Sequence, residues 1–470
     1  MVVERFKYSI TLLSNMILID RKKELEFLEK IYDSKKSEFI IIYGRRRLGK
    51  TYLVKYFIEN KPHFYFLSKQ RAIEKEFLDF KEKVSRKFNV FLEANNFENL
   101  FEEIDKKISK GKRFVIVVDE FTYWIINNKG IVSEFQYYWD EILSKKNIML
   151  IFLGSYMPVI EDVLLSYKSP IYGRKTGQIE LSQMPLISLK EFFPKKSVAE
   201  LIEIYGFADT IPYYLLMVSK EANFKEMLKN LLSPYLNFYS DAEFLIKEEL
   251  REYNVYLDIL KAINDGSTKL NEISSKSRVD ITNISKYLKV LRGMKIIDKI
   301  KPLTANTKEK NYLYILKDNY FKFWLRFIYP YYTEIAENLN EHVGFIEKNY
   351  NNYLGNIFEE FCKRLLIEYK IFPFLNIGKW WYKDKEIDIV ALNEKTKEIL
   401  FCECKWQDRV NAGKIIKELV GKAEYVEWEN EKRKKSYAVF AKSFSKRIKE
   451  FEGKKVYCFD LRDIKKALRK

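Results

Sequence analysis

The segment that most constrains the fold is residues 37–57, SEFIIIYGRRRLGKTYLVKYF, where an apolar run meets a glycine-containing loop and then a helical pattern. The apolar run from Ile40 to Tyr43 predicts a strand that is buried on both faces. The next eight residues, GRRRLGKT, match the spacing G-x-x-x-x-G-K-[ST]. A strand, loop and helix in this order predict a phosphate-binding loop, because backbone N–H groups at a helix N-terminus attract phosphate oxygens.

Residue types within the loop predict two ligands, a nucleoside triphosphate and Mg²⁺. The Lys50 ammonium would reach the β- and γ-phosphates, and the Thr51 hydroxyl would hold the metal ion. The whole loop is expected to contact the nucleotide: Gly44, Arg45, Arg46, Arg47, Leu48, Gly49, Lys50 and Thr51.

A second buried strand, in the segment KRFVIVVDEFTYW, ends in two acids. We expect Asp119 to hold Mg²⁺ through water, and Glu120 to orient and deprotonate the attacking water. Taken alone, the segment also fits a buried strand that ends in a solvated acidic turn. The preceding phosphate-binding loop favours the catalytic interpretation.

Two further polar residues are candidates for the same site. Ser155 follows the apolar strand in NIMLIFLGSYMPVIED, where a side chain could sense the γ-phosphate or the attacking water. An N-cap or turn serine is an equal alternative. Arg174, in SPIYGRKTGQIEL, is a candidate arginine finger that would stabilise charge on the transferring phosphoryl group, and an ordinary surface arginine is its alternative.

The motifs GRRRLGKT, VVDE, LGS and SPIYGRKTGQIEL, followed by MPL, look like those of the archaeal ATPase family, AAA+-like P-loop proteins related to the STAND signalling ATPases. The opening LIDRKKELEFLEKI resembles the family's entry segment. This similarity runs from about residue 17 to the end of the chain, and it implies an ATPase core at 17–190 that binds ATP and Mg²⁺, with a helical lid at 191–250. The segment FADTIPYYL lacks the family's small glycine-rich turn, which puts lid contacts with the nucleotide in doubt.

Residues 251–318 resemble a winged helix-turn-helix: three helical stretches, then a strand pair joined by the basic turn TANTKEKN. The third helix, from Ile281 to Met294, is expected to begin at the N-cap Asp280. Its polar residues that could face the DNA major groove are Thr282, Asn283, Ser285, Lys286, Lys289 and Arg292. A solvated helix face, with the domain packed on the ATPase core, is the alternative. An aromatic helical linker is predicted at 319–345.

The segment EIDIVALNEKTKEILFCECKW, residues 386–406, predicts a hairpin whose second strand has two chemically different faces. Successive side chains of a strand point to opposite faces. One face carries Phe401, Glu403 and Lys405, and the other carries Cys402, Cys404 and Trp406. This alternation predicts that the cysteines pack as small apolar side chains, and a thiol zinc site is the weaker alternative.

Asp388 on the first strand and Glu403 on the second are expected to meet and hold a hard divalent cation, Mg²⁺ or Mn²⁺. Lys405 would hold or activate a water beside the metal. This arrangement resembles the PD-(D/E)xK nuclease core, which implies a helical glutamate before the hairpin, Glu359 or alternatively Glu360. It also implies a restriction-endonuclease-like α/β domain at 346–470 that either cleaves phosphodiesters or only binds a partner.

Composition limits the partners. A formal net charge of +18 favours a polyanion such as DNA, although Lys- and Glu-rich surfaces also occur in proteins of hot environments. Apolar runs are far shorter than the roughly 20 residues of a membrane-spanning helix. Four cysteines are too few for a disulfide framework and indicate a reducing cytoplasm. Met16 is an alternative start, and the oligomeric state is not indicated.

The expected fold is α/β: a P-loop NTPase core with a parallel sheet, a helical lid, a winged helix-turn-helix and the nuclease-like domain. The first functional hypothesis is an ATPase whose nucleotide state controls nucleic-acid binding or cleavage by the carboxyl-terminal domain. The alternative is a nucleotide switch or scaffold whose carboxyl-terminal domain only binds a partner.

Overall fold

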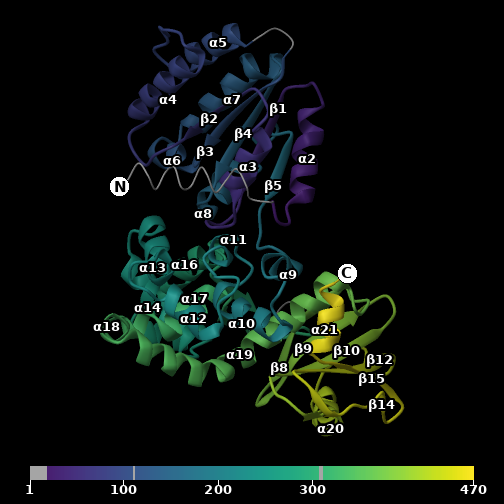
Figure 1. The fold of residues 1–470 in the computed structure, drawn as a ribbon. Helices are drawn as coiled ribbons and strands as arrows, with labels where there is room; N and C mark the ends of the chain where they lie inside the picture. The colour runs from purple at the N-terminus through teal and green to yellow at the C-terminus, as the bar shows by residue number, and fades with distance from the viewer. Residues whose placement is uncertain (1–17, 109–111, 306–310, 470) are drawn as a thin grey trace. The chain divides into compact units, whose positions relative to one another are not determined.

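The structure, a computed structural model, describes residues 18–108, 112–305 and 311–469. Met16, Ile17 and part of the basic turn at 306–310 therefore lie outside the described residues. The chain divides after Gln183 into two compact units, which we describe separately (Figure 1).

The first unit is built on a five-stranded parallel sheet. Its order is β2-β3-β4-β1-β5, and every neighbouring pair is parallel. All residues of β1, β3 and β4 are buried, which explains their unbroken apolar sequences. The strands are β1 (Glu38–Tyr43), β2 (His63–Leu67), β3 (Phe114–Asp119), β4 (Ile148–Gly154) and β5 (Gly177–Glu180).

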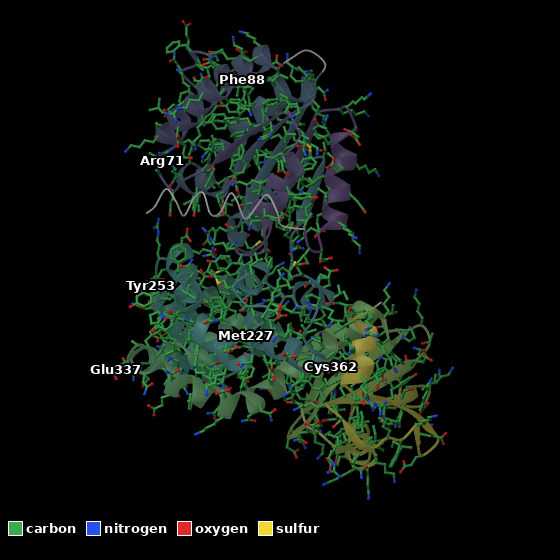
Figure 2. All side chains as sticks on the ribbon, viewed as in Figure 1. Arg71, Phe88, Met227, Tyr253, Glu337 and Cys362 are labelled. Carbon is green, nitrogen blue, oxygen red and sulfur yellow. The ribbon has the colours of Figure 1, made fainter. Side chains whose placement is uncertain are left out.

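Helices of the first unit cover this sheet (Figure 1). Alternate residues of β1, Phe39 and Ile41, belong to one buried aromatic cluster together with residues of α4, α5, α6 and α7, among them Trp124. The helices are α2 (Lys22–Tyr32), α3 (Lys50–Ile58), α4 (Ile73–Phe88), α5 (Phe97–Lys107), α6 (Thr122–Asn127), α7 (Ile131–Glu141), η1 (Leu143–Lys145), α8 (Met157–Val159) and η2 (Ile160–Leu164). Figure 2 labels Phe88 at the end of α4, and Arg71 just before that helix.

The second unit begins with helices. They are α9 (Ile187–Phe192), α10 (Val198–Ala208), α11 (Pro212–Leu215), α12 (Phe224–Leu231), α13 (Asn237–Glu249), α14 (Tyr253–Asn264), α15 (Leu270–Ser277), α16 (Ile281–Gly293), α17 (Asn319–Phe327), η3 (Tyr329–Tyr331) and α18 (Tyr332–Glu337). After α14, α15 and α16 comes an antiparallel pair, β6 (Ile297–Ile300) and β7 (Leu313–Leu316), in the predicted order. The side chain of Asp280 caps α16 by accepting the Thr282 N–H at 2.8 Å. Aromatic residues of α17 such as Trp324 are fully buried, so they fill a core.

A mixed six-stranded sheet, in the order β14-β15-β12-β10-β9-β8, forms the rest of this unit. β9 and β10 are antiparallel, whereas β10, β12 and β15 are parallel. The strands are β8 (Asn376–Tyr382), β9 (Lys385–Asn393), β10 (Glu398–Lys405), β12 (Lys434–Ala441), β14 (Glu450–Phe451) and β15 (Lys454–Phe459), with a separate pair β11 (Val410–Asn411) and β13 (Phe444–Lys446). The helices are α19 (Leu339–Tyr369), α20 (Ala412–Ala423) and α21 (Leu461–Ala467).

Two observed boundaries differ from the expected ones. The first compact unit ends at Gln183, whereas the ATPase core was expected to reach residue 190. The expected boundary between residues 345 and 346 falls inside α19, a continuous helix of 31 residues. The end of the expected linker and the start of the expected carboxyl-terminal domain therefore belong to one helix, whose backbone hydrogen bonds continue across residue 345. Within the described residues, no helix is both long and apolar enough to span a membrane.

Candidate functional sites

Two glycines of the loop after β1 have positive φ angles, which favour glycine. Gly44 has φ +146°, and a Cβ added there would lie 2.3 Å from the backbone oxygen of Leu181. Gly49 has φ +87° and is the N-cap of α3. Both positions lie in the left-handed region, where a side chain is strained, so the spacing of the motif follows from the backbone.

The Lys50 side chain is buried against the loop that precedes it. Its ammonium donates to the backbone oxygens of Gly44 at 2.7 Å and Arg45 at 3.0 Å. Arg21, in the entry segment, donates to the oxygens of Leu48 at 3.3 Å and Ser182 at 2.8 Å, and so ties that segment to the loop. Sequence reasoning did not single out Arg21.

Thr51 of the phosphate-binding loop contacts Asp119 at the end of β3, as expected if both hold the same metal ion. The Thr51 hydroxyl donates to Asp119 Oδ2 at 2.7 Å, and the Tyr65 hydroxyl of β2 donates to the same oxygen at 2.6 Å. Burial raises the pKa of Asp119, and the hydrogen bonds from Tyr65 and Thr51 oppose that rise. Tyr65 was missed, because only the pairing of β2 with β3 brings it to this acid.

Glu120 and Ser155 also come together. The Ser155 hydroxyl lies 2.7 Å and 2.6 Å from the two carboxylate oxygens of Glu120. The sheet order explains this contact, because β4 lies between β3 and the loop strand β1. Glu120 has φ +56°, a left-handed conformation that is uncommon for a residue with a side chain.

Arg174 pairs elsewhere. Its guanidinium donates to the Asp140 carboxylate of α7, with Nη2 at 3.0 Å and Nε at 3.2 Å, and to the backbone oxygen of Pro170 at 3.1 Å. In this arrangement the side chain is committed to an ion pair with Asp140, and its role as an arginine finger stays a prediction.

A second acidic site lies in the carboxyl-terminal sheet. Among the described residues, one group of carboxylates has oxygens close enough together, all within 4.8 Å, to share a metal ion: Glu359 of α19 with Glu386 and Asp388 of β9. Glu386 was missed, although it lies two residues before Asp388 and therefore on the same strand face. Glu360, the alternative to Glu359, instead lies 3.9 Å from Lys363.

Glu403 is held by lysines and lies outside that group. Its carboxylate accepts from Lys405 at 2.7 Å and from Lys422 of α20 at 2.7 Å, and the side chain is 3% exposed. Lys405 also lies 4.0 Å from Asp388, so both acids are neighbours of this lysine. Lys422 had no sequence signal, because it reaches the strand from the following helix.

The surroundings of Asp388 favour its protonated form. Burial, with smaller contributions from Glu359 and Glu403, raises the pKa of Asp388 to about 7, although its Oδ2 accepts the Cys404 N–H at 2.8 Å. Burial also raises the pKa of Glu359, while the nearby Lys379 lowers it. A carboxyl cluster that resists losing its protons would gain from a divalent cation.

The cysteines of this region are packed. Cys362, Cys402 and Cys404 are buried free thiols, and burial raises the pKa of each. Figure 2 labels Cys362, which lies on α19. Within the described residues, no cysteine joins a group that could share a metal ion. The burial of these three thiols agrees with the packing interpretation.

On the third helix of the expected winged helix, α16, the polar residues singled out from the sequence are all exposed: Thr282, Asn283, Ser285, Lys286, Lys289 and Arg292. The apolar residues Ile284, Leu288 and Leu291 are buried on the opposite face. The helix is therefore amphipathic, and its polar face is accessible.

Comparisons with known proteins identify an ATPase domain in the amino-terminal part of the chain. Residues 18–218 match the family described as an ATPase domain predominantly from Archaea, and residues 324–416 match a family of archaeal and bacterial proteins of unknown function. An uncharacterized protein of Methanocaldococcus jannaschii is 37% identical over 456 residues, 95% of this chain and 100% of that protein. An uncharacterized ATP-binding protein of the same organism is 27% identical over 194 residues, 39% of this chain and 50% of that protein.

A solved structure, the Walker-type ATPase of Pyrococcus abyssi, is similar in fold, with a TM-score of 0.50 and 20% identity. The match covers 66% of this chain and 96% of that one. The full-length relative and the matched ATPase domain together show that this chain belongs to the archaeal ATPase family.

Proposed function

We propose that the first unit binds ATP with Mg²⁺ and hydrolyses it. Two contacts at the carboxyl-terminal ends of β3 and β4 carry this proposal: Thr51 with Asp119, and Ser155 with Glu120. The loop after β1 has glycines with positive φ, as a phosphate-binding loop requires. Hydroxyl and carboxylate oxygens are the ligands that Mg²⁺ prefers, so Thr51 and Asp119 fit the ion. When bound, Mg²⁺ would neutralise charge on the phosphates.

Each residue of the site has a role in this proposal. Lys50 binds the β- and γ-phosphates after it leaves the loop carbonyls that now accept its hydrogen bonds. Glu120 takes the proton of the attacking water, and Ser155 fixes the orientation of its carboxylate. Arg174 acts on the nucleotide only if its ion pair with Asp140 opens.

Glu120→Gln tests this assignment. The substitution keeps the shape and the hydrogen bond with Ser155 but removes the base, so ATP should still bind while turnover falls by about 10²-fold or more. Nucleotide affinity and steady-state phosphate release measure the two effects separately. Turnover that survives the substitution would show that Glu120 is not the base.

For the carboxyl-terminal sheet we infer metal-dependent phosphodiester cleavage. The convergence of Glu359, Glu386 and Asp388, with Lys405 on the neighbouring strand, supports this second activity. Three carboxylates fit a hard divalent cation, which when bound would activate water and polarise a phosphate. The geometry favours Glu386 over Glu403 as a metal ligand, and Glu403 then serves to position Lys405 and Lys422.

Cleavage of DNA by the purified full chain with Mn²⁺, with and without ATP, tests this activity. Glu386→Gln and Asp388→Asn should each abolish cleavage, whereas Glu394→Gln, at the exposed turn after β9, should not. No cleavage under any of these conditions would favour the alternative function, a nucleotide switch whose carboxyl-terminal domain only binds a partner.

We also propose DNA as the polyanion that the +18 charge attracts, with contacts from the exposed face of α16. Nucleotide state would then control access of the sheet to that DNA. Substitution of Lys286 and Lys289 by glutamine should weaken DNA binding and flatten its salt dependence. Unchanged affinity and salt dependence would remove α16 from the interface.

A further inference from the structure

A lysine from the edge strand β8 lies against the acidic group of the carboxyl-terminal sheet. The Lys379 ammonium is 3.2 Å from Glu359 Oε2 and 2.5 Å from Glu386 Oε1. These carboxylates are two of the three whose oxygens converge within 4.8 Å. Lys379 therefore makes contact with the same side chains that a divalent cation would need.

The electrostatics of Lys379 keep it charged in this position. Two carboxylates face its ammonium at once, and each favours the charged form of the lysine. One ammonium thus partly neutralises the acidic group, whose members Glu359 and Asp388 are half-buried and whose member Glu386 is exposed.

We propose that Lys379 is a built-in cation that competes with divalent metal for the group formed by Glu359, Glu386 and Asp388. This inference rests on the metal site proposed above. An ammonium and a metal ion cannot both lie against the same carboxylate oxygens without strong repulsion, so metal binding requires Lys379 to leave. The lysine therefore weakens metal affinity while it stabilises the metal-free fold.

Calorimetric titration of the nucleotide-free full chain with Mn²⁺ tests the competition. Lys379→Met, similar in length but neutral, should bind Mn²⁺ more tightly than the wild type by on the order of tenfold or more. Lys379→Arg keeps the charge and should retain the wild-type affinity. The matched control is Lys435→Met on β12 of the same sheet, which removes an equal charge from an ion pair with Glu424 at the end of α20 and should change little.

A second readout separates competition from a purely structural role. Without metal, Lys379→Met should melt at a lower temperature than the wild type, because Glu359 and Glu386 lose their cation. Saturating Mn²⁺ should then raise the melting temperature of the variant more than that of the wild type. If Lys379→Met does not fold, Lys379→Gln, whose amide can still donate to the carboxylates, takes its place in both measurements.

The outcomes distinguish this inference from the function on which it rests. Equal or weaker Mn²⁺ binding by the neutral variants, with clear binding by the wild type, would overturn the competition and leave the metal site standing. Mn²⁺ binding that is absent in every variant, or that survives Asp388→Asn and Glu386→Gln unchanged, would overturn the metal site and the inference with it.

Discussion

The two candidate sites of this chain hold their charged groups in opposite ways. In the first unit, at the carboxyl-terminal ends of the parallel strands, Lys50 donates to backbone carbonyls and Asp119 accepts from the hydroxyls of Thr51 and Tyr65. In the carboxyl-terminal sheet, the carboxylates are met by lysines: Lys379 contacts Glu359, and Lys405 and Lys422 contact Glu403. At the first site, Lys50 must give up hydrogen bonds to neutral carbonyls before it can bind a charged ligand. The second is already an ionic network, and a ligand must replace one of its members.

Lys50→Ala should have the largest effect and should separate the two sites. Removal of the side chain that is expected to reach the β- and γ-phosphates should reduce ATP turnover by on the order of 10²-fold or more. Mn²⁺ binding by the nucleotide-free variant should be unchanged, because the acidic group in the other unit is intact. Steady-state phosphate release and Mn²⁺ titration measure the two sites. Unchanged turnover would contradict the assignment of the phosphate-binding loop.

Glu403→Gln probes the ionic site. The substitution leaves Lys405 and Lys422 without their shared buried anion, so it should lower the free energy of unfolding by about 1–2 kcal/mol. Chemical denaturation monitored by Trp fluorescence measures the loss. Glu394→Gln at the exposed turn should cost less than about 0.5 kcal/mol. Equal stability of both variants would mean that the two lysines do not depend on Glu403.

The pH dependence of stability should carry the signature of Asp388. Because its pKa is raised to about 7, the folded chain binds the proton more tightly than the unfolded chain does. Asp388 therefore lowers the free energy of unfolding progressively as pH rises from about 4 to about 7. Above about pH 7 this loss of stability no longer grows. In metal-free buffer, Asp388→Asn should be as stable as the wild type at the acid end and more stable, by on the order of 1 kcal/mol or more, near pH 8.

Thermal melts of both proteins across this pH range measure the difference. A wild type that stays equally stable relative to Asp388→Asn at every pH would contradict the raised pKa. Added Mn²⁺ should reverse the order near pH 8, because the metal stabilises only the chain that retains the carboxylate.

Tyr65→Phe should give the smallest effect and tests how the first site is arranged. It removes one of two hydroxyl donors to Asp119, a loss of about 1 kcal/mol, so the Mg²⁺ concentration for half-maximal ATP turnover should rise several-fold. Maximal turnover at saturating Mg²⁺ should change less. Tyr56→Phe, exposed on α3, is the control. Equal Mg²⁺ dependence in both variants would leave Tyr65 without a role in positioning Asp119.

Local spacing accounted for what could be predicted from the sequence. The loop glycines, Lys50 and Thr51 follow from the backbone requirements of one motif, and the alternation of β10 separated Glu403 from the packed cysteines. Glu386 was accessible by the same alternation on β9. Tyr65, Lys379 and Lys422 were not, because each reaches its partner through strand or helix pairing that no local pattern encodes. The expected boundary between residues 345 and 346 falls inside α19, which is one continuous helix in the structure.

That helix has a mechanical consequence. With a rise of 1.5 Å per residue, the 31 residues of α19 form a rod about 46 Å long. Its middle is anchored to α10 by the Tyr353 hydroxyl, which donates to the Gly206 oxygen at 2.7 Å, and its last turns are anchored by Arg364, which donates to the Met184 oxygen at 2.7 Å. Glu359 lies between these two anchors. Glu359, one of the proposed metal ligands, therefore lies on a stretch of rigid helix that is held at both ends by hydrogen bonds within the second unit.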